Sequence, residues 1–493
     1  MAQGLAGRQA PRFEHCTLKP RMQIPFTRSI SGLAALATIF HAAVAAAEPA
    51  PRHPNIILLI TDQQSAEALS CRQGDRYLRT PHMDSLAARG TFFTRAYAAN
   101  PICIPSRTSM FTGRYPHETG IQNNDRVPFD VRAFPTMGTY FRQAGYDTGY
   151  VGKWHILTPI EESATSGFDY TANIKNNGAD AATPAAVDAF LQRKHERPFL
   201  LVASFINPHN IAEWARGQEL PDGDIGPPPP PADCPPAPAN LAPPVGEPEA
   251  IAFARRSYQA APMFPVGGFD EAKWRQYRWA YYRMIERTDA LIGQVLASLA
   301  ATGHADDTLI VFTADHGDCQ GAHGWNQKTV FYEESVRVPF IVCPPGVTQP
   351  GTSDRLVQTG IDLLPTLGDF AGITLPPVLR GRSQRAAAEG ATGPDPRQYV
   401  VASNHLVQGV PLLGLMMKPA GRMLRTARYK YCVYDQGRQR ESLVDLDNDP
   451  GELVNLAEEP AYARILNEHR ALLLEWSRSA RDTTFPFIPA TVL

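Results

Sequence analysis

The sequence has little net charge and few cysteines. Its 47 lysines and arginines are balanced by 49 aspartates and glutamates, a formal net charge of −2. Nucleic-acid-binding proteins normally carry a basic excess, so this balance argues against that class. Seven cysteines in 493 residues are too few for a disulfide scaffold. Only 19 % of the residues are charged and 43 % are apolar, which excludes a disordered polyelectrolyte and suffices for a large core.

Long apolar runs are also scarce, and the one present lies near the N-terminus. Residues 30–44 follow a basic segment and precede Ala45-Ala46-Ala47-Glu48. A basic segment, a short apolar run and an Ala-x-Ala site are typical of a secretory signal peptide. A transmembrane anchor is the alternative, but the run is short, rich in alanine and interrupted by His41. We therefore expect a signal peptide over residues 1–47, export to the periplasm or the medium, and no membrane contact once the signal is removed.

Three apolar runs predict the central strands of a sheet. Residues 55–60, 198–205 and 308–312 are apolar on both faces, as in parallel strands covered by helices on both sides. Helix signals lie between them, over Thr80 to Gly90 and over Asp270 to Gly303. This alternation predicts an α/β fold with a large mixed, mostly parallel sheet sandwiched by helices.

Proline content and the C-terminal pattern predict the domain organisation. Twelve of the 45 prolines lie between Pro221 and Ala250, which predicts an extended loop. Beyond residue 395 come strand-like runs at 399–403, 412–417 and 429–434, and then a closing helix over about residues 460–479. We predict an α/β domain over residues 48–395 and a small β-rich C-terminal subdomain with a terminal helix over residues 396–493.

Two aspartates follow two of the predicted central strands. Asp62 and Asp315 each have a second potential ligand beside them, Gln63 and His316. Because the carboxyl ends of parallel strands meet at one edge of a sheet, we expect these side chains to converge. Carboxylate and carboxamide oxygens suit Ca²⁺ or Mg²⁺, whereas His316 favours Mn²⁺ or Zn²⁺. A capping role for Asp62 alone is the alternative, and it leaves the matched pair unexplained.

Residues 101–114, Pro-Ile-Cys-Ile-Pro-Ser-Arg-Thr-Ser-Met-Phe-Thr-Gly-Arg, contain the densest group of reactive side chains. Pro105 at the first helical position and Gly113 after the last predict a short helix. Cys103 then lies at the helix N-terminus, where N–H groups and the helix dipole favour an anion by ~0.3–1 kcal/mol. Arg107 follows one turn later, and its planar guanidinium suits a tetrahedral oxyanion. The residues leave two interpretations open, a nucleophile in an anion-binding cradle or a buried structural cysteine.

Cys103-Ile-Pro-Ser-Arg107, followed by Thr112-Gly113-Arg114, resembles the Cys-x-Pro-Ser-Arg signature of type I sulfatases in the alkaline phosphatase superfamily. In that family a formylglycine-generating enzyme oxidises the cysteine to formylglycine, whose hydrate attacks the sulfur of a sulfate ester. Further segments are similar to other motifs of the family: Gly152-Lys153-Trp154-His155, Asn207-Pro208-His209, Trp325-Asn326-Gln327-Lys328, and Leu446 with residues 449–456. The resemblance covers most of the chain after residue 47 and implies an alkaline-phosphatase-like fold.

The resemblance also implies a role for each matched residue. Lys153, Lys328 and Arg107 would offset the charge of the sulfate oxygens. His209 would donate a proton to the leaving alcohol, and His155 would act as a base during sulfate release. The cation would be Ca²⁺, with Mg²⁺ and Mn²⁺ as alternatives, and the substrate would be an O-sulfate of a saccharide, of choline or of an aryl compound. The implied metal ligands are Asp62, Gln63, the modified Cys103, Asp315 and His316.

Two positions depart from the usual pattern of the family. Many sulfatases have a second Asp after the first and an Asn after the later one, where this chain has Gln63 and His316. The same set occurs in relatives that cleave phosphonate or phosphate esters and in choline-sulfatase-like enzymes, so a phosphonate or phosphate ester hydrolase is the alternative function. A non-catalytic secreted carbohydrate-binding protein on this scaffold is a more distant alternative. Asn124 and His323 are additional candidates for the site.

Overall fold

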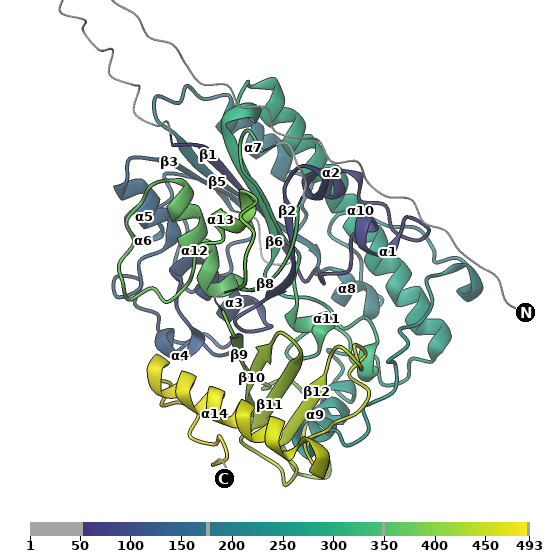
Figure 1. The fold of residues 1–493 in the computed structure, drawn as a ribbon. Helices are drawn as coiled ribbons and strands as arrows, with labels where there is room; N and C mark the ends of the chain where they lie inside the picture. The colour runs from purple at the N-terminus through teal and green to yellow at the C-terminus, as the bar shows by residue number, and fades with distance from the viewer. Residues whose placement is uncertain (1–52, 174–177, 348–350, 396, 491–493) are drawn as a thin grey trace, which may run out of the picture. The chain divides into compact units, whose positions relative to one another are not determined.

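The structure is a computed structural model that describes residues 53–173, 178–347, 351–395 and 397–490. The predicted signal peptide over residues 1–47 lies outside the described residues. The described chain contains a large sheet with helices on both faces and a small antiparallel sheet near the C-terminus (Figure 1). Within the described residues, no helix has the length and apolar character needed to cross a membrane.

The large sheet has the strand order β4-β3-β5-β1-β6-β7-β2-β8. The three predicted central strands are neighbours, because β1 pairs in parallel with both β5 and β6. Among the strands of this sheet that the structure describes, only β7 runs antiparallel to its neighbours, β6 and β2. The predicted mixed, mostly parallel sheet is therefore confirmed. The strands are β1 (Asn55–Asp62), β2 (Thr91–Tyr97), β3 (Asp147–Gly152), β4 (Tyr170–Asn173), β5 (Phe199–Pro208), β6 (Thr308–Ala314), β7 (Phe340–Cys343) and β8 (Gly351–Gln358).

Helices cover both faces of this sheet and divide the core into two layers. Side chains at 56, 58 and 60 of β1 pack with α3, α5, α12 and α13, and those at 57 and 59 pack with α2, α7 and α10. All residues of β1 are buried, which explains why its sequence is apolar without alternation. The first layer comprises α3 (Cys103–Thr112), α5 (Met137–Gln143), α12 (Thr359–Phe370) and α13 (Arg385–Ala388). The second layer comprises α2 (Pro81–Arg89), α7 (Thr183–Leu191) and α10 (Glu271–Ala301).

The two predicted helices of the second layer are present at their predicted places. α2 begins at Pro81 and ends before Gly90. Asp270 caps α10, since its Oδ1 accepts a hydrogen bond from Lys273 N at 2.8 Å. The remaining short elements are α1 (Ser70–Gln73), α4 (Pro116–Thr119), α6 (Ser163–Ser166), α8 (Ile211–Ala215), α11 (Glu333–Val336), and the 3₁₀ helices η1 (Pro231–Asp233), η2 (Ala305–Asp307), η3 (Ala322–Gly324) and η4 (Pro460–Tyr462).

The small sheet has the order β12-β11-β10-β9 and lies between two helices. One face packs on α14 through Leu473 and Trp476, and the other packs near α9 through Tyr258. The predicted terminal helix is α14, but the strand predicted over 412–417 is wrong. Leu413 and Gly414 adopt positive φ angles, so that run folds back on itself in a single bridge between Leu412 and Leu415. The elements are α9 (Glu249–Gln259), β9 (Tyr399–His405), β10 (Ala420–Thr426), β11 (Tyr429–Tyr434), β12 (Glu441–Asp445) and α14 (Ala463–Ala480).

Candidate active site

Two buried carboxylates meet at one edge of the large sheet. Asp62 ends β1 and Asp315 follows β6, its parallel neighbour. Arg107 of α3 joins them, because its Nε donates to Asp315 Oδ2 at 2.8 Å and its Nη2 donates to Asp62 Oδ2 at 3.1 Å. Its Nη1 donates to the backbone oxygen of Lys153 and to Ser204 Oγ. Most of the five N–H donors of this guanidinium are thus committed to the protein.

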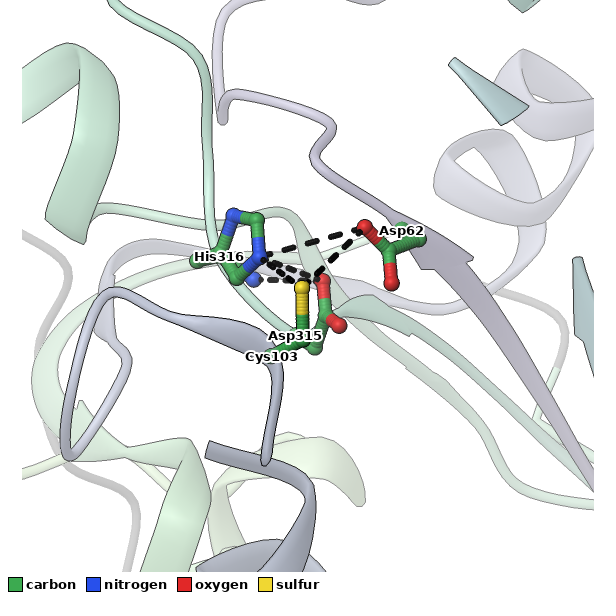
Figure 2. Close-up of side chains that lie close together, drawn as sticks. All are labelled: Asp62, Cys103, Asp315 and His316. Carbon is green, nitrogen blue, oxygen red and sulfur yellow. Dashed lines mark hydrogen bonds and ion pairs between the residues drawn. The ribbon is translucent and has the colours of Figure 1, made fainter. Parts of the chain in front are cut away.

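The other oxygens of the two carboxylates share a centre with His316 and Cys103 (Figure 2). His316 Nε2 lies 3.8 Å from Asp62 Oδ1, 3.6 Å from Asp315 Oδ1 and 3.3 Å from Cys103 Sγ. The ligand atoms of these four buried side chains all lie within 4.8 Å of one another. His316 Nδ1 lies 3.0 Å from Gly317 O, and a proton on Nδ1 would leave Nε2 free to bind a metal.

This cluster fits a divalent cation. Burial and repulsion by the negative charge of Asp62 raise the pKa of Asp315 to about 6. A cation held by the two carboxylates would offset that repulsion. Carboxylate oxygens together with an imidazole nitrogen are a donor set that several divalent ions accept.

Gln63 lies beside the cluster rather than inside it. Its Oε1 accepts a hydrogen bond from Lys328 Nζ at 2.8 Å, and its Nε2 donates to Asp318 Oδ2 at 2.7 Å. Its backbone N–H donates to Asp315 Oδ1 at 3.1 Å. The carboxamide is therefore held next to the carboxylate cluster, with its oxygen directed to Lys328.

Cys103 is the first residue of α3, which begins two residues earlier than predicted. Pro105 is consequently the third helical residue, where its missing N–H costs no intrahelical hydrogen bond. Lys328 Nζ donates to Cys103 Sγ at 3.0 Å. Burial and Asp62 raise the pKa of the thiol, but Lys328 and the other cationic groups outweigh them and hold it well below its ordinary value. These surroundings favour an anion at position 103, which supports the anion-binding interpretation over that of an inert structural cysteine.

The predicted lysines and histidines surround this position. Lys153 Nζ forms an ion pair with Asp62 Oδ2 at 2.8 Å. Burial tends to raise the pKa of Asp62, but Lys153, His209 and Arg107 hold it well below its ordinary value. Burial and the two lysines lower the pKa of His209 to about 3, and burial lowers the pKa of His155. The thiol of Cys103 acts on both imidazoles in the opposite direction, so both lie beside it.

The structure thus brings together all the residues predicted for the site. The two additional candidates, Asn124 and His323, have different surroundings. Asn124 is adjacent, because its Oδ1 accepts a hydrogen bond from Ile104 N at 3.0 Å. His323 instead stacks on Tyr332, with ring centroids 3.9 Å apart, and contacts Asn240.

Sequence reasoning missed three supporting residues. Asp318 orients Gln63, and Ser204 binds Arg107. Asp180 accepts hydrogen bonds from Ile206 N and Asn207 N just before His209. The short spacing from Asp315 to Asp318 was a usable signal. Ser204 and Asp180 belong to no motif of the site, and their partners lie 97 and 26 to 27 residues away in sequence.

Comparisons with known proteins agree with this geometry. The Sulfatase family model matches residues 54–373, and the model of the N-sulphoglucosamine sulphohydrolase C-terminal region matches residues 321–479. The Δ4,5-hexuronate-2-O-sulfatase of Bacteroides thetaiotaomicron is 31 % identical, over 89 % of this chain and 91 % of that protein. The choline-sulfatase of Rhizobium meliloti is 29 % identical, over 83 % of each chain.

A solved structure gives the same result. A 2-O GAG sulfatase superposes with a TM-score of 0.76 at 28 % identity, over 89 % of this chain and 95 % of that one. The family match spans well over half of the chain, and its residues include the two carboxylates and the cysteine of the cluster. The chain therefore belongs to the sulfatase family of the alkaline phosphatase superfamily and is a sulfuric ester hydrolase.

Proposed function

We propose that this protein hydrolyses an O-sulfate ester of a saccharide, with a formylglycine formed from Cys103 and one divalent cation, preferably Ca²⁺. The observation that carries the proposal is the environment of Cys103 Sγ, which has Lys328 Nζ at 3.0 Å and His316 Nε2 at 3.3 Å in a buried cluster. An unmodified thiol would have to form and break an S–S bond in each turnover. Formylglycine instead supplies, as its hydrate, a hydroxyl that attacks the sulfur of the ester.

The residues of the chain divide the remaining work. Asp62, Asp315 and His316, with Gln63 beside them, would hold the cation, which would bind a sulfate oxygen and make the sulfur more electrophilic. Lys153 and Lys328 would offset the negative charge of the sulfate group. Arg107 was predicted for the same role, but its donors are directed at the two carboxylates, so it would act by fixing their positions.

His209 is the proposed proton donor to the leaving alcohol, and His155 the proposed base. Burial and the charges of Lys328 and Lys153 lower the pKa of His209 to about 3, so this imidazole is neutral at neutral pH when no sulfate is bound. A sulfate ester between the two lysines would offset their charge and raise the pKa of His209. Substrate binding would thus prepare the proton that the alcohol needs when it leaves.

Similarity to proteins that act on sugar sulfates supports a saccharide substrate. A hexuronate-2-O-sulfatase is 31 % identical, and a 2-O GAG sulfatase shares the fold at 28 % identity. The predicted signal peptide over residues 1–47 would direct export of the enzyme and then be removed. The mature enzyme would lie in a compartment that sulfated saccharides can reach.

The decisive experiment combines a modification assay with a comparison of substrates. After co-expression with a formylglycine-generating enzyme, peptide mass spectrometry across residue 103 is expected to show formylglycine. The value of kcat/KM for p-nitrophenyl sulfate is expected to exceed those for the matching phosphate and phosphonate esters by about 100-fold or more. The variant Cys103→Ala is expected to be inactive, whereas Cys71→Ala, at an exposed cysteine, is the matched control.

Two outcomes would contradict the proposal. Full activity of a chain that retains the thiol at position 103 would exclude the formylglycine route. A preference for the phosphonate or phosphate ester would instead establish the alternative hydrolase function.

A further inference from the structure

The candidate active site has a half-buried rim on one side. Cys103, Lys153 and His316 are almost fully buried, as expected for groups that hold a desolvated sulfate. His155, His209 and Asn124 are half-buried instead. A leaving group that extends toward this less buried side would contact the side chains there.

Two further segments are anchored at this rim. The loop before residue 125 is held against the start of α3, since Asn100 Nδ2 donates to Gln122 O at 3.1 Å and Ile104 N donates to Asn124 Oδ1 at 3.0 Å. The end of β9 lies nearby, because Ser403 N donates to Ala99 O at 2.9 Å.

The end of β9 is also tied to the segment that carries Lys328. Asn404 Nδ2 donates to Thr329 O at 2.7 Å, and Thr329 N donates to Pro101 O at 2.9 Å. As a result His405 meets Asn123 across 282 residues of sequence, with Asn123 Nδ2 and His405 Nδ1 3.3 Å apart. This pair belongs to none of the sequence motifs.

The pair offers neutral hydrogen-bonding groups at the rim. The carbonyl oxygen of Asn123 accepts a hydrogen bond from Asp125 N at 2.8 Å and keeps a second lone pair, and its NH₂ group has a second N–H beside the one near His405. A neutral His405 has one donor and one acceptor. Burial lowers the pKa of His405 despite the opposing charges of Asp435 and Asp125, which favours the neutral imidazole. Both side chains are half-buried, and the hydrogen bond between them is rather long. A hydrogen bond with the backbone of Lys418 also holds His405.

We propose that Asn123 and His405 bind hydroxyl groups of the sugar ring that carries the sulfate, and so select saccharide sulfates over aryl and choline sulfates. A sugar hydroxyl both donates and accepts, which matches this pair. A quaternary ammonium group has neither function, and an aryl ring presents an apolar face. The inference rests on the proposed function, because it assumes that a sulfate ester binds at Cys103.

The test compares two kinds of sulfate ester on the same formylglycine-bearing enzyme. Values of kcat/KM would be measured for N-acetylglucosamine 6-sulfate and a hexuronate 2-sulfate disaccharide, and for p-nitrophenyl sulfate, which has no sugar hydroxyl. In Asn123→Ala and in His405→Ala, the ratio of the better saccharide substrate to p-nitrophenyl sulfate is expected to fall by about tenfold. The variant His405→Gln, which keeps a donor and an acceptor, is expected to recover part of that ratio.

The control is His82→Ala, at an exposed histidine of α2, which is expected to change neither rate. Parallel losses on both kinds of ester would show a structural role for the pair and overturn the inference. An unchanged ratio would overturn it as well. If p-nitrophenyl sulfate is cleaved but neither saccharide is, the inference fails while sulfate ester hydrolysis stands. If no sulfate ester is cleaved, the proposed function itself fails.

Discussion

Arg107 shows how much of this site depends on the shape of one side chain. Its guanidinium donates to both Asp62 and Asp315 through different nitrogens, and all three side chains are fully buried. A planar fork with several fixed donors can join two carboxylates in this way, whereas an ammonium group acts as a point charge. Arg107 therefore sets the separation of the two carboxylates that would hold the cation.

We predict that Arg107→Lys, which keeps the charge, lowers kcat/KM for p-nitrophenyl sulfate by about 100-fold or more. The lysine cannot reach both carboxylates, and an unpaired buried carboxylate costs about 3–5 kcal/mol, so Tm is expected to fall as well. Steady-state kinetics and thermal unfolding measure the two effects. Arg438→Lys, at an arginine whose side chain is 92 % exposed, is the matched control. Activity of Arg107→Lys within about threefold of the parent would show that the fork geometry is not needed.

Among the strands and helices, the sequence pattern predicted those whose burial depends on their own residues. The apolar runs that became β1, β5 and β6 need burial on both faces, and that requirement places them at the centre of a covered sheet. The carboxylates at the ends of β1 and β6 then had to meet. Contacts between distant segments have no such pattern in the sequence. The pairing of Asn123 with His405 spans 282 residues and depends on where β9 docks, which periodicity does not reveal.

Two predictions were wrong for related reasons, the first residue of α3 and the strand over residues 412–417. A proline is tolerated anywhere in the first helical turn, so Pro105 did not mark the first residue. The apolar residues of 412–417 are typical of a strand, but Gly414 permits a reversal there, and Leu413 remains fully exposed. Propensity could not decide between a paired strand and a turn, because no partner strand is visible in sequence.

A buried ion pair attaches the chain after α14 to the small sheet. Arg422 of β10 donates through Nε to Asp482 Oδ2 at 2.7 Å, and both side chains are 1 % exposed. Burial tends to raise the pKa of Asp482, but the hydrogen bond and charge of Arg422 lower it below its ordinary value. The carboxylate therefore stabilises the fold above the ordinary aspartate pKa of about 3.9, and this contribution is lost as the pH falls through the lower native value.

We predict that Asp482→Asn lowers the free energy of unfolding at pH 7 by about 2 kcal/mol, because a hydrogen bond to a buried charged group is lost. Urea titrations between pH 7 and about pH 3 are expected to show this difference shrinking as wild-type Asp482 becomes protonated. Glu249→Gln removes one partner of the exposed Arg438 ion pair and serves as the control without a measurable loss. A difference that grows toward acid pH would contradict the assignment.

For the molecule as a whole, the net charge of −2 conceals a concentration of charge at one edge of the large sheet. Arg107, Lys153 and Lys328 lie there with Asp62 and Asp315, all of them buried. A divalent cation would add two positive charges and make this edge strongly cationic, which suits an anionic ester in a site shielded from solvent. The cation would also connect the end of β1 with the segment that follows β6, two parts of the chain that are distant in sequence.

Removal of the cation is therefore expected to affect both chemistry and stability. Treatment with a chelator followed by dialysis should lower kcat/KM for p-nitrophenyl sulfate by about 100-fold or more, and Ca²⁺ should restore it. Because the ion binds the folded state, Tm is expected to rise with Ca²⁺ concentration, whereas Asp315→Asn should show little response. Elemental analysis by mass spectrometry would report one ion per chain in the active enzyme. Full activity in a sample free of metal would overturn the cation proposal. Recovery with Mn²⁺ but not with Ca²⁺ would identify the ion as Mn²⁺, which His316 favours.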